Sequence, residues 1–258
     1  MSKYEYVDVE RAGPKTVITL DNVEKRNRLS QGMIDDLTAS LKTAERDEST
    51  AVVLAGKDGV FCAGADITSF EPEASEALGG RIFGEGDFRV LFDTVENLEK
   101  PVIAAIDGMA LAGGFELALV CDFVVVGEDV EMGTPESRIG IAPGVAYVRL
   151  ADQIAHHRAM EIMMTGESYA GAEVVEMGLF NEAVPTEEVR AVVDEYVDKL
   201  ADVAPVALTV IKKVANRHRG GEDRAIANLG VGLLFETDDA KEGFEAFREG
   251  RPPEFEGS

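Results

Sequence analysis

The chain has 258 residues, of which 45% are hydrophobic and 29% are charged. This share of apolar residues excludes an intrinsically disordered chain and suffices for one large domain, or for a core domain with a smaller appendage. Asp and Glu number 49 against 25 Lys and Arg, which gives a formal net charge of −24. Such a charge repels phosphate backbones and anionic lipid, so nucleic-acid and membrane-surface partners are disfavoured.

The same charge also repels itself and weakens the compact state in ordinary buffer. Concentrated salt removes this cost because the Debye length falls to about 3 Å near 1 M. A salty cytoplasm, and therefore a halophilic source, explains the composition most simply; an acidic protein with ordinary solubility needs is the alternative.

Metal sites, disulfides and targeting segments find no support in the sequence. The two cysteines and three histidines form no paired-thiol or zinc-ligand motif, so we expect no metal. Residues 1–6 lack the apolar centre of a signal peptide, and no run of about 18 apolar residues occurs. We therefore expect a soluble, cytoplasmic protein.

Strands and helices alternate through the first 145 residues. Residues 4–9 and 16–20 alternate apolar and polar residues around a Gly-Pro turn, which predicts two joined strands. Ser30 precedes apolar residues at helical spacing, which predicts a capped helix reaching Ala44. Uniformly apolar runs at 51–55, 102–106 and 122–126 indicate strands covered on both faces, and residues 88–98 and 115–120 have helical patterns. This alternation predicts an α/β domain.

The strand signals fade after about residue 145. Helical patterns bounded by Gly or Pro cover residues 155–165, 170–177, 186–201, 206–219, 225–235 and 240–248. We therefore expect the last third of the chain to be helical.

A loop of small residues, 61–67, directly follows the strand predicted at 51–55; it reads Phe-Cys-Ala-Gly-Ala-Asp-Ile. Small residues let the backbone approach a ligand and leave N–H groups free to point outward, as an oxyanion hole requires. An ordinary tight turn is the alternative.

A second segment runs from the strand predicted at 102–106 through a glycine turn into a helix. The first N–H groups and the dipole of such a helix favour a developing negative charge, so Gly113 stands where a second oxyanion donor is useful. Glu116 falls in the first helical turn, where satisfying the helix dipole is its alternative role. Glu136 follows 20 residues later in the segment beginning Gly133-Thr134-Pro135, and a solvated surface charge is its alternative.

Together, these three segments resemble the crotonase superfamily, the enoyl-CoA hydratase/isomerase family, in order and in residue type. The resemblance covers nearly the whole chain. It implies an α/β fold with a crotonase-type core of repeated β-β-α turns over residues 1–200. A C-terminal helical oligomerisation region, residues 201–258, would pack homotrimers or homohexamers.

The resemblance also implies roles for particular residues. The N–H groups of Ala63 and Gly113 would hold the thioester oxygen, Glu116 would activate water and Glu136 would handle the proton at the α-carbon. The residues that would line the CoA site are Ala63, Gly64, Ala65, Asp66, Ile67 and Gly144.

The implied activity is that of an enoyl-CoA hydratase, a lyase of fatty acid metabolism such as β-oxidation, which adds water syn across the double bond of a 2-enoyl-CoA. It needs no cofactor beyond the CoA of its acyl-CoA substrate. Among enzymes, the alternative is an isomerase, which can manage with the carboxylate at Glu136, or another CoA-thioester reaction of the same superfamily, such as hydrolysis. A non-catalytic binding protein, for instance one that recognises RNA, is a further alternative. The acidic balance argues against RNA, and both glutamates argue against a loss of catalysis.

Two departures from the family pattern leave the pocket shape open. Hydratases of the family often have Pro-Gly-Ala-Gly-Gly-Thr-Gln-Arg-Leu after the second glutamate, whereas residues 143–150 read Pro-Gly-Val-Ala-Tyr-Val-Arg-Leu, which is shorter and bulkier. Arg28 stands where alanine is usual. We expect Arg28 to face solvent; contact with a CoA phosphate is the alternative.

Overall fold

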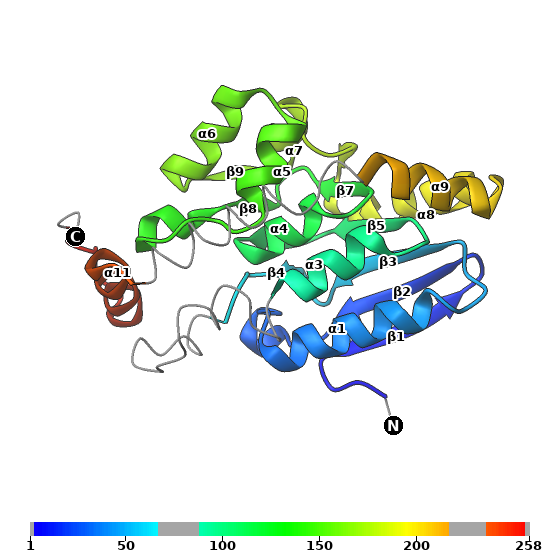
Figure 1. Cartoon of the computed structure of the whole chain (residues 1–258), viewed down its shortest axis with the longest axis horizontal. Helices are drawn as coiled ribbons and strands as arrows, with labels where there is room; N and C mark the ends of the chain where they lie inside the picture. The colour runs from blue at the N-terminus through cyan, green and yellow to red at the C-terminus, as the bar shows by residue number, and fades with distance from the viewer. Residues whose placement is uncertain (1–2, 67–87, 217–235, 256–258) are drawn as a thin grey trace.

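The structure, a computed structural model, describes residues 3–66, 88–216 and 236–255 and contains two β-sheets (Figure 1). The larger sheet comprises, in spatial order, β1 (Val7–Ala12), β2 (Lys15–Leu20), β3 (Ala51–Gly56), β5 (Val102–Ile106), β7 (Phe123–Gly127) and β10 (Glu182–Val184). The smaller sheet comprises β4 (Val60–Cys62), β6 (Met109–Leu111), β8 (Glu131–Gly133) and β9 (Ser168–Ala170). Adjacent strands are parallel except in the β1–β2 and β8–β9 pairs.

Helices follow the strands in chain order. The α-helices are α1 (Gln31–Ala44), α3 (Phe88–Asn97), α4 (Gly113–Leu119), α5 (Ala146–Gln153), α6 (His156–Thr165), α7 (Gly171–Glu176), α8 (Val189–Ala201), α9 (Pro205–Asn216) and α11 (Asp238–Glu249). Short 3-10 turns are η1 (Val23–Lys25), η3 (Pro135–Ile139) and η4 (Thr186–Glu188). The expected cap of α1 is present: the Ser30 hydroxyl accepts the Met33 N–H at 3.3 Å.

The chain repeats a unit of two strands followed by a helix. β5 enters the larger sheet, β6 enters the smaller one and α4 follows; β7, β8 and η3 repeat the order. This arrangement is the β-β-α core expected from the sequence, and it brings the segments that follow β4, β6 and β8 to one region because those strands are neighbours in the smaller sheet.

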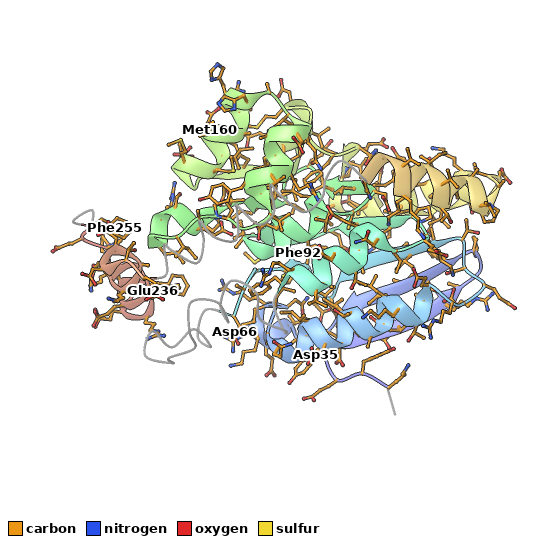
Figure 2. The ribbon with its side chains drawn as sticks, viewed as in Figure 1. Asp35, Asp66, Phe92, Met160, Glu236 and Phe255 are labelled. Carbon is orange, nitrogen blue, oxygen red and sulfur yellow. The ribbon has the colours of Figure 1, made fainter. Side chains whose placement is uncertain are left out.

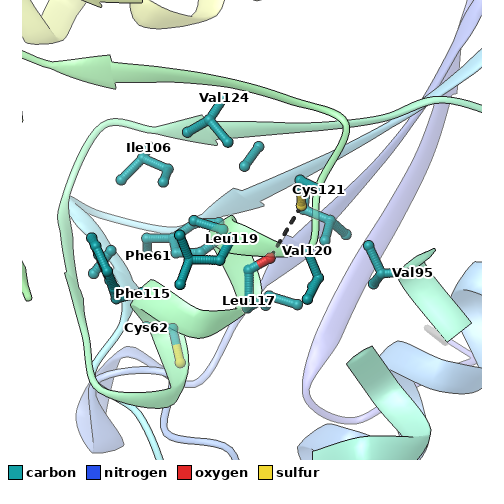
Figure 3. Packing of buried hydrophobic residues seen from close by; sticks show 14 of the residues in the cluster. Phe61, Cys62, Val95, Ile106, Phe115, Leu117, Leu119, Val120, Cys121 and Val124 are labelled. Carbon is teal, nitrogen blue, oxygen red and sulfur yellow. Dashed lines mark hydrogen bonds between the residues drawn. The ribbon is translucent and has the colours of Figure 1, made fainter. Parts of the chain in front are cut away.

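The larger sheet is buried on both faces, as its apolar strands predict. Along β3, Val52 and Leu54 belong to one hydrophobic cluster, while Ala51, Val53 and Ala55 belong to another that α8 covers. Figure 3 shows the first cluster around α4, where Phe115, Leu117 and Leu119 are buried together with Phe61 and other apolar side chains. The buried helix α4 therefore has a fixed position relative to the strands.

Several expectations for the last third were wrong. It contains β9 and β10 besides helices, and α5 begins at Ala146, ahead of the first helix predicted there. The short strands of the smaller sheet were also missed, since three residues carry too little pattern to be recognised. The helix expected at residues 225–235 lies outside the described residues, as do the last three residues of the one expected at 206–219.

The C-terminal helices lie at opposite ends of the molecule, with α9 near α8 and α11 far from both (Figure 1). Lys212 ties α9 to the core through an ion pair with Asp122 at 2.6 Å. In α11, a Cβ on Gly243 would lie 2.2 Å from the carbonyl oxygen of Ile139, so this helix packs closely on η3. The division into residues 1–200 and 201–258 stays a prediction. Within the described ranges, no helix is both long and apolar enough to cross a bilayer.

Candidate active site

The loop after β4 is held by main-chain hydrogen bonds to the segment before α1. The Leu29 N–H donates to the Gly64 carbonyl at 2.7 Å, and the Asp66 N–H donates to the Leu29 carbonyl at 3.3 Å. This parallel bridge turns the intervening Ala65 N–H away from Leu29.

This loop packs closely against the start of α4 at two glycines. A Cβ on Gly114 would lie 2.1 Å from the Cys62 carbonyl oxygen, and one on Gly64 would lie 2.5 Å from the Ala112 Cβ. Only glycine allows this approach. Ala112, which directly precedes α4, has φ 51° and ψ −127°, a strained conformation of the kind that gathers at functional sites.

The predicted oxyanion donor Ala63 is wrong. Its N–H already donates to the Arg26 carbonyl at 3.0 Å and has no capacity left for a substrate oxygen. The N–H groups of Ala65 and Gly113 have no acceptor in the described part of the chain. They are also close, because a Cβ on Gly113 would lie 3.5 Å from the Ala65 nitrogen. The donor pair available to an oxyanion is therefore Ala65 and Gly113.

Glu116 is 6% exposed and lies in the first turn of α4. Its Oε1 accepts the N–H of Val145 at 2.6 Å and the N–H of Ala146 at 2.9 Å. These donors stand at the N-terminus of α5, where the helix dipole adds to the attraction for negative charge. The surroundings of Glu116 therefore favour the ionised carboxylate.

Glu136 is buried to a similar degree, with 8% exposure, but in different surroundings. It lies in η3, whose preceding Thr134 hydroxyl donates to the Ile162 carbonyl at 3.3 Å. The Glu136 Oε2 has no hydrogen-bond partner among the described residues. Burial, followed by the negative charge of Glu116, raises the pKa of Glu136 well above its usual range. The fold thus brings the two predicted glutamates together and favours the protonated acid at Glu136.

The residues predicted for CoA binding fall into two groups. Ala63, Gly64, Ala65 and Asp66 lie in the loop after β4, whereas Gly144 directly precedes Val145, whose N–H bonds to Glu116. Asp66 lies on the side of the molecule toward α11 (Figure 2). Ile67 is outside the described residues.

Arg28 does not face solvent freely, contrary to our expectation. Its guanidinium forms an ion pair with the Asp66 carboxylate at 3.1 Å, and the side chain is about three-quarters buried. Arg28 therefore helps to hold the loop that carries Ala65.

The Cys62 thiol and the potential metal ligands of the described chain offer no further chemistry at this site. Burial raises the pKa of the Cys62 thiol to about 12, which disfavours the nucleophilic thiolate. In the described ranges, His, Cys, Asp and Glu form no group of three or more placed to hold a metal ion.

The sequence did not reveal the two N–H donors to Glu116. Every residue except proline has a backbone N–H, so residue type does not show which N–H will bind a carboxylate. The segment around Gly144 was noticed only because it departs from a family pattern. The available signal was the helical spacing of Ala146, Arg149 and Leu150, which predicts the start of a helix at the place where α5 begins.

Comparisons with known proteins agree with this fold. Residues 14–258 match the family model described as enoyl-CoA hydratase/isomerase. The chain is 33% identical over 251 residues to a short-chain-enoyl-CoA hydratase of Clostridium acetobutylicum, covering 95% of each chain. It is 30% identical to an enoyl-CoA hydratase from Mycobacterium avium of known structure, with a TM-score of 0.84 over 96% of this chain and 98% of that one.

A further similar structure is a methylmalonyl-CoA decarboxylase in complex with 2-nitronate-propionyl-CoA. It has a TM-score of 0.86, covers 99% of this chain and 100% of that one, and is 24% identical, so the likeness concerns the fold alone.

The two-sheet core with its helices is thus the fold of the crotonase superfamily. Within this superfamily, the chain belongs to the enoyl-CoA hydratase/isomerase family.

Proposed function

We propose that this protein is an enoyl-CoA hydratase that adds water across the double bond of a 2-enoyl-CoA. The observation that carries the proposal is the pair of buried glutamates with opposite surroundings: Glu116 accepts two backbone N–H groups, whereas Glu136 has a raised pKa. Pairs of acids whose environments favour different protonation states are suited to general base and general acid work.

The thioester carbonyl would be polarised by the N–H groups of Ala65 and Gly113. Negative charge accumulates on this oxygen when a nucleophile attacks the β-carbon, and two preorganised donors stabilise that charge. Losing one such donor typically costs about 2.7–4 kcal/mol of transition-state stabilisation.

The two glutamates would divide the proton transfers. Glu116 takes a proton from water as the hydroxyl oxygen bonds to the β-carbon, and Glu136 delivers its proton to the α-carbon. The pair then holds as many protons as before, and transfer from Glu116 to Glu136 resets it. Because the two groups are coupled, their titration belongs to the pair.

CoA would bind along the loop of Gly64, Ala65 and Asp66, and the chain would work in the cytoplasm without a further cofactor. Isomerisation is the second candidate, since moving a proton between two carbons can be managed by one carboxylate. The favourable surroundings of an ionised Glu116 support hydration instead, because hydration needs a base for water besides the proton donor.

A spectrophotometric assay with crotonyl-CoA in multimolar KCl tests the proposal, with a 3-enoyl-CoA in parallel. A hydratase removes the absorbance of the conjugated thioester. No reaction on crotonyl-CoA, with turnover of the 3-enoyl-CoA, would instead identify an isomerase.

Glutamine variants test the assigned roles. E116Q and E136Q should each lower hydratase turnover about 10²-fold or more, the usual scale for general acid–base groups, while CoA-thioester binding survives. The double variant should lose much less than the product of both losses. An isomerase would show a severe loss for E136Q and a mild one for E116Q. Near-native turnover in both single variants would refute the mechanism.

A further inference from the structure

A buried ion pair joins α3 to α5. The Nε–H of Arg149 donates to Glu96 Oε1 at 2.6 Å, and its Nη2 lies 2.5 Å from the same oxygen. Arg149 is 2% exposed and Glu96 is 4% exposed. Taking two charges out of water is costly, and replacing such a pair by apolar residues is often neutral or stabilising. A contribution to stability is therefore a weak explanation for the presence of this ion pair. Because the contact is directional, the pair can instead fix the orientation of α5 relative to α3.

The position of Arg149 connects the ion pair to Glu116. The Arg149 N–H donates to the Val145 carbonyl at 3.0 Å, within the first turn of α5. Val145 and Ala146 are the residues whose N–H groups donate to Glu116 Oε1. A rotation or shift of Arg149 therefore moves the donors to the carboxylate directly.

α5 depends on such contacts for its placement. A helix of eight residues is too short to be stable alone, so its position is set by tertiary contacts. Ala146 and Leu150 supply apolar burial, which is not directional, and the Gln153 side chain donates to the Leu119 carbonyl at the far end of α5. The ion pair adds a directional contact close to the turn that faces Glu116.

α3 is a firm support for this contact. Two residues of α9 donate to its last turn: Lys212 Nζ to the Val95 carbonyl at 2.9 Å, and Asn216 Nδ2 to the Glu96 carbonyl at 3.1 Å. The chain of contacts thus runs from α9 through α3 and α5 to the Glu116 carboxylate.

We propose that Glu96 and Arg149 are positioning residues, whose ion pair orients the N-terminus of α5 so that Val145 and Ala146 hold the Glu116 carboxylate in its reactive place. This inference rests on the proposed role of Glu116 as the base for water. It assigns a function to Arg149, which keeps the Arg-Leu ending of the usual family pattern in a segment that otherwise departs from it.

The double variant E96M/R149M tests the proposal, because it removes both charges while keeping apolar bulk. The midpoint of thermal unfolding should stay the same or rise. Turnover of crotonyl-CoA should nevertheless fall about 10-fold or more, since small misplacements of catalytic groups are costly, while KM changes less than about threefold. R149K, which keeps the positive charge, should lose less turnover than R149M.

A control is D107N/R190M, which removes another, more exposed arginine–carboxylate pair, of 2.7 Å, between α8 and the turn after β5. It should leave turnover unchanged. Equal losses of turnover in both double variants, in step with a lower unfolding midpoint, would show a merely structural role and overturn the proposal.

Amide hydrogen exchange separates this inference from the proposed function, because it needs no turnover. In E96M/R149M, exchange at the Val145 and Ala146 amides should be faster by about tenfold or more, while exchange in α4 stays unchanged. Absence of activity in the native chain on both enoyl-CoA substrates would refute the proposed function, and the exchange would still decide on the positioning role. Unchanged exchange at the Val145 and Ala146 amides in E96M/R149M overturns the positioning role.

Discussion

Glu116 and Glu136 have the same side chain and nearly the same burial, yet their surroundings favour opposite charge states. Backbone N–H groups at the start of α5 compensate the charge on Glu116. Glu136 has an oxygen without a hydrogen-bond partner in the described chain and faces the charge of Glu116. Hydrogen bonding, rather than burial, therefore distinguishes the proposed base from the proposed acid.

The raised pKa of Glu136 makes a prediction about stability. Below about pH 4.3, both the folded and the unfolded chain hold this proton. As the pH rises from there through the higher pKa of the folded state, the unfolded chain gives up the proton more easily, so native stability is lost. The variant E136Q cannot ionise and escapes this loss.

We expect the unfolding midpoint of E136Q to rise relative to that of the native chain between about pH 4 and pH 8. The gain should be a few degrees, because about 1 kcal/mol shifts the midpoint of a chain of this size by roughly 2–4 °C. Thermal melts across this range, with the exposed Glu187→Gln as control, measure the difference. If the difference in midpoint between E136Q and the native chain is the same at about pH 4 and about pH 8, the pKa of Glu136 is not raised.

At the residue scale, the sequence led to the correct loop but to the wrong donor within it. Ala63 and Ala65 are both alanines in a run of small residues, and nothing in residue type separates them. The main-chain bridge to Leu29 and the bond from Ala63 to Arg26 decide which N–H stays available. Such information lies in long-range pairing, which a local pattern does not contain.

At the scale of elements, prediction succeeded where a segment carries a long pattern. The three apolar strands and α1 with its Ser30 cap are present as expected. The smaller sheet was missed because β4, β6, β8 and β9 have three residues each. These short strands nevertheless bring the two oxyanion segments and Glu136 together. The elements that build the site are thus those with the weakest sequence signal.

Helix α9 has an apolar row that the described chain leaves uncovered. Val206 is 76% exposed and Ile211 is 63% exposed, and Val210 and Val214 continue the row at helical spacing. Exposed apolar patches of this kind mark protein–protein contacts. With the family resemblance, this row supports our proposal that copies of the chain associate as trimers or hexamers.

We expect light scattering in high salt to give a mass near three or six chains. V210E/V214E should lower that mass, because charges within an apolar interface are costly to bury. M164E on α6, which adds a charge at another exposed apolar residue, serves as the control and should keep the native mass. A monomer at micromolar concentration in the native chain would rule out the assembly.

At the scale of the whole molecule, the net charge of −24 must be compatible with a tightly packed core. Some acids are paired, as Asp47 is with Lys100, an ion pair that contributes to a strongly lowered pKa of Asp47. Many others stand on exposed surfaces; Asp8, Glu10, Glu187, Asp198 and Asp202 are examples. Their mutual repulsion acts over the Debye length and opposes folding most strongly in dilute salt.

We therefore predict that both the unfolding midpoint and the turnover rise with KCl over the molar range. Between about 0.1 M and 2 M KCl the midpoint should rise by about 5 °C or more, which corresponds to roughly 2 kcal/mol for a chain of this length. Replacing the five exposed acids named above by Asn or Gln should raise the midpoint in dilute salt and flatten its dependence on KCl, because less repulsion remains to be screened.

Sucrose at matched osmolality provides a control, since it strengthens apolar burial without screening charge. If the midpoint stays flat or falls with KCl, surface repulsion does not limit stability. The same conclusion follows if the neutralised variant responds to KCl as strongly as the native chain does. Either result would leave the acidic composition without a saline explanation.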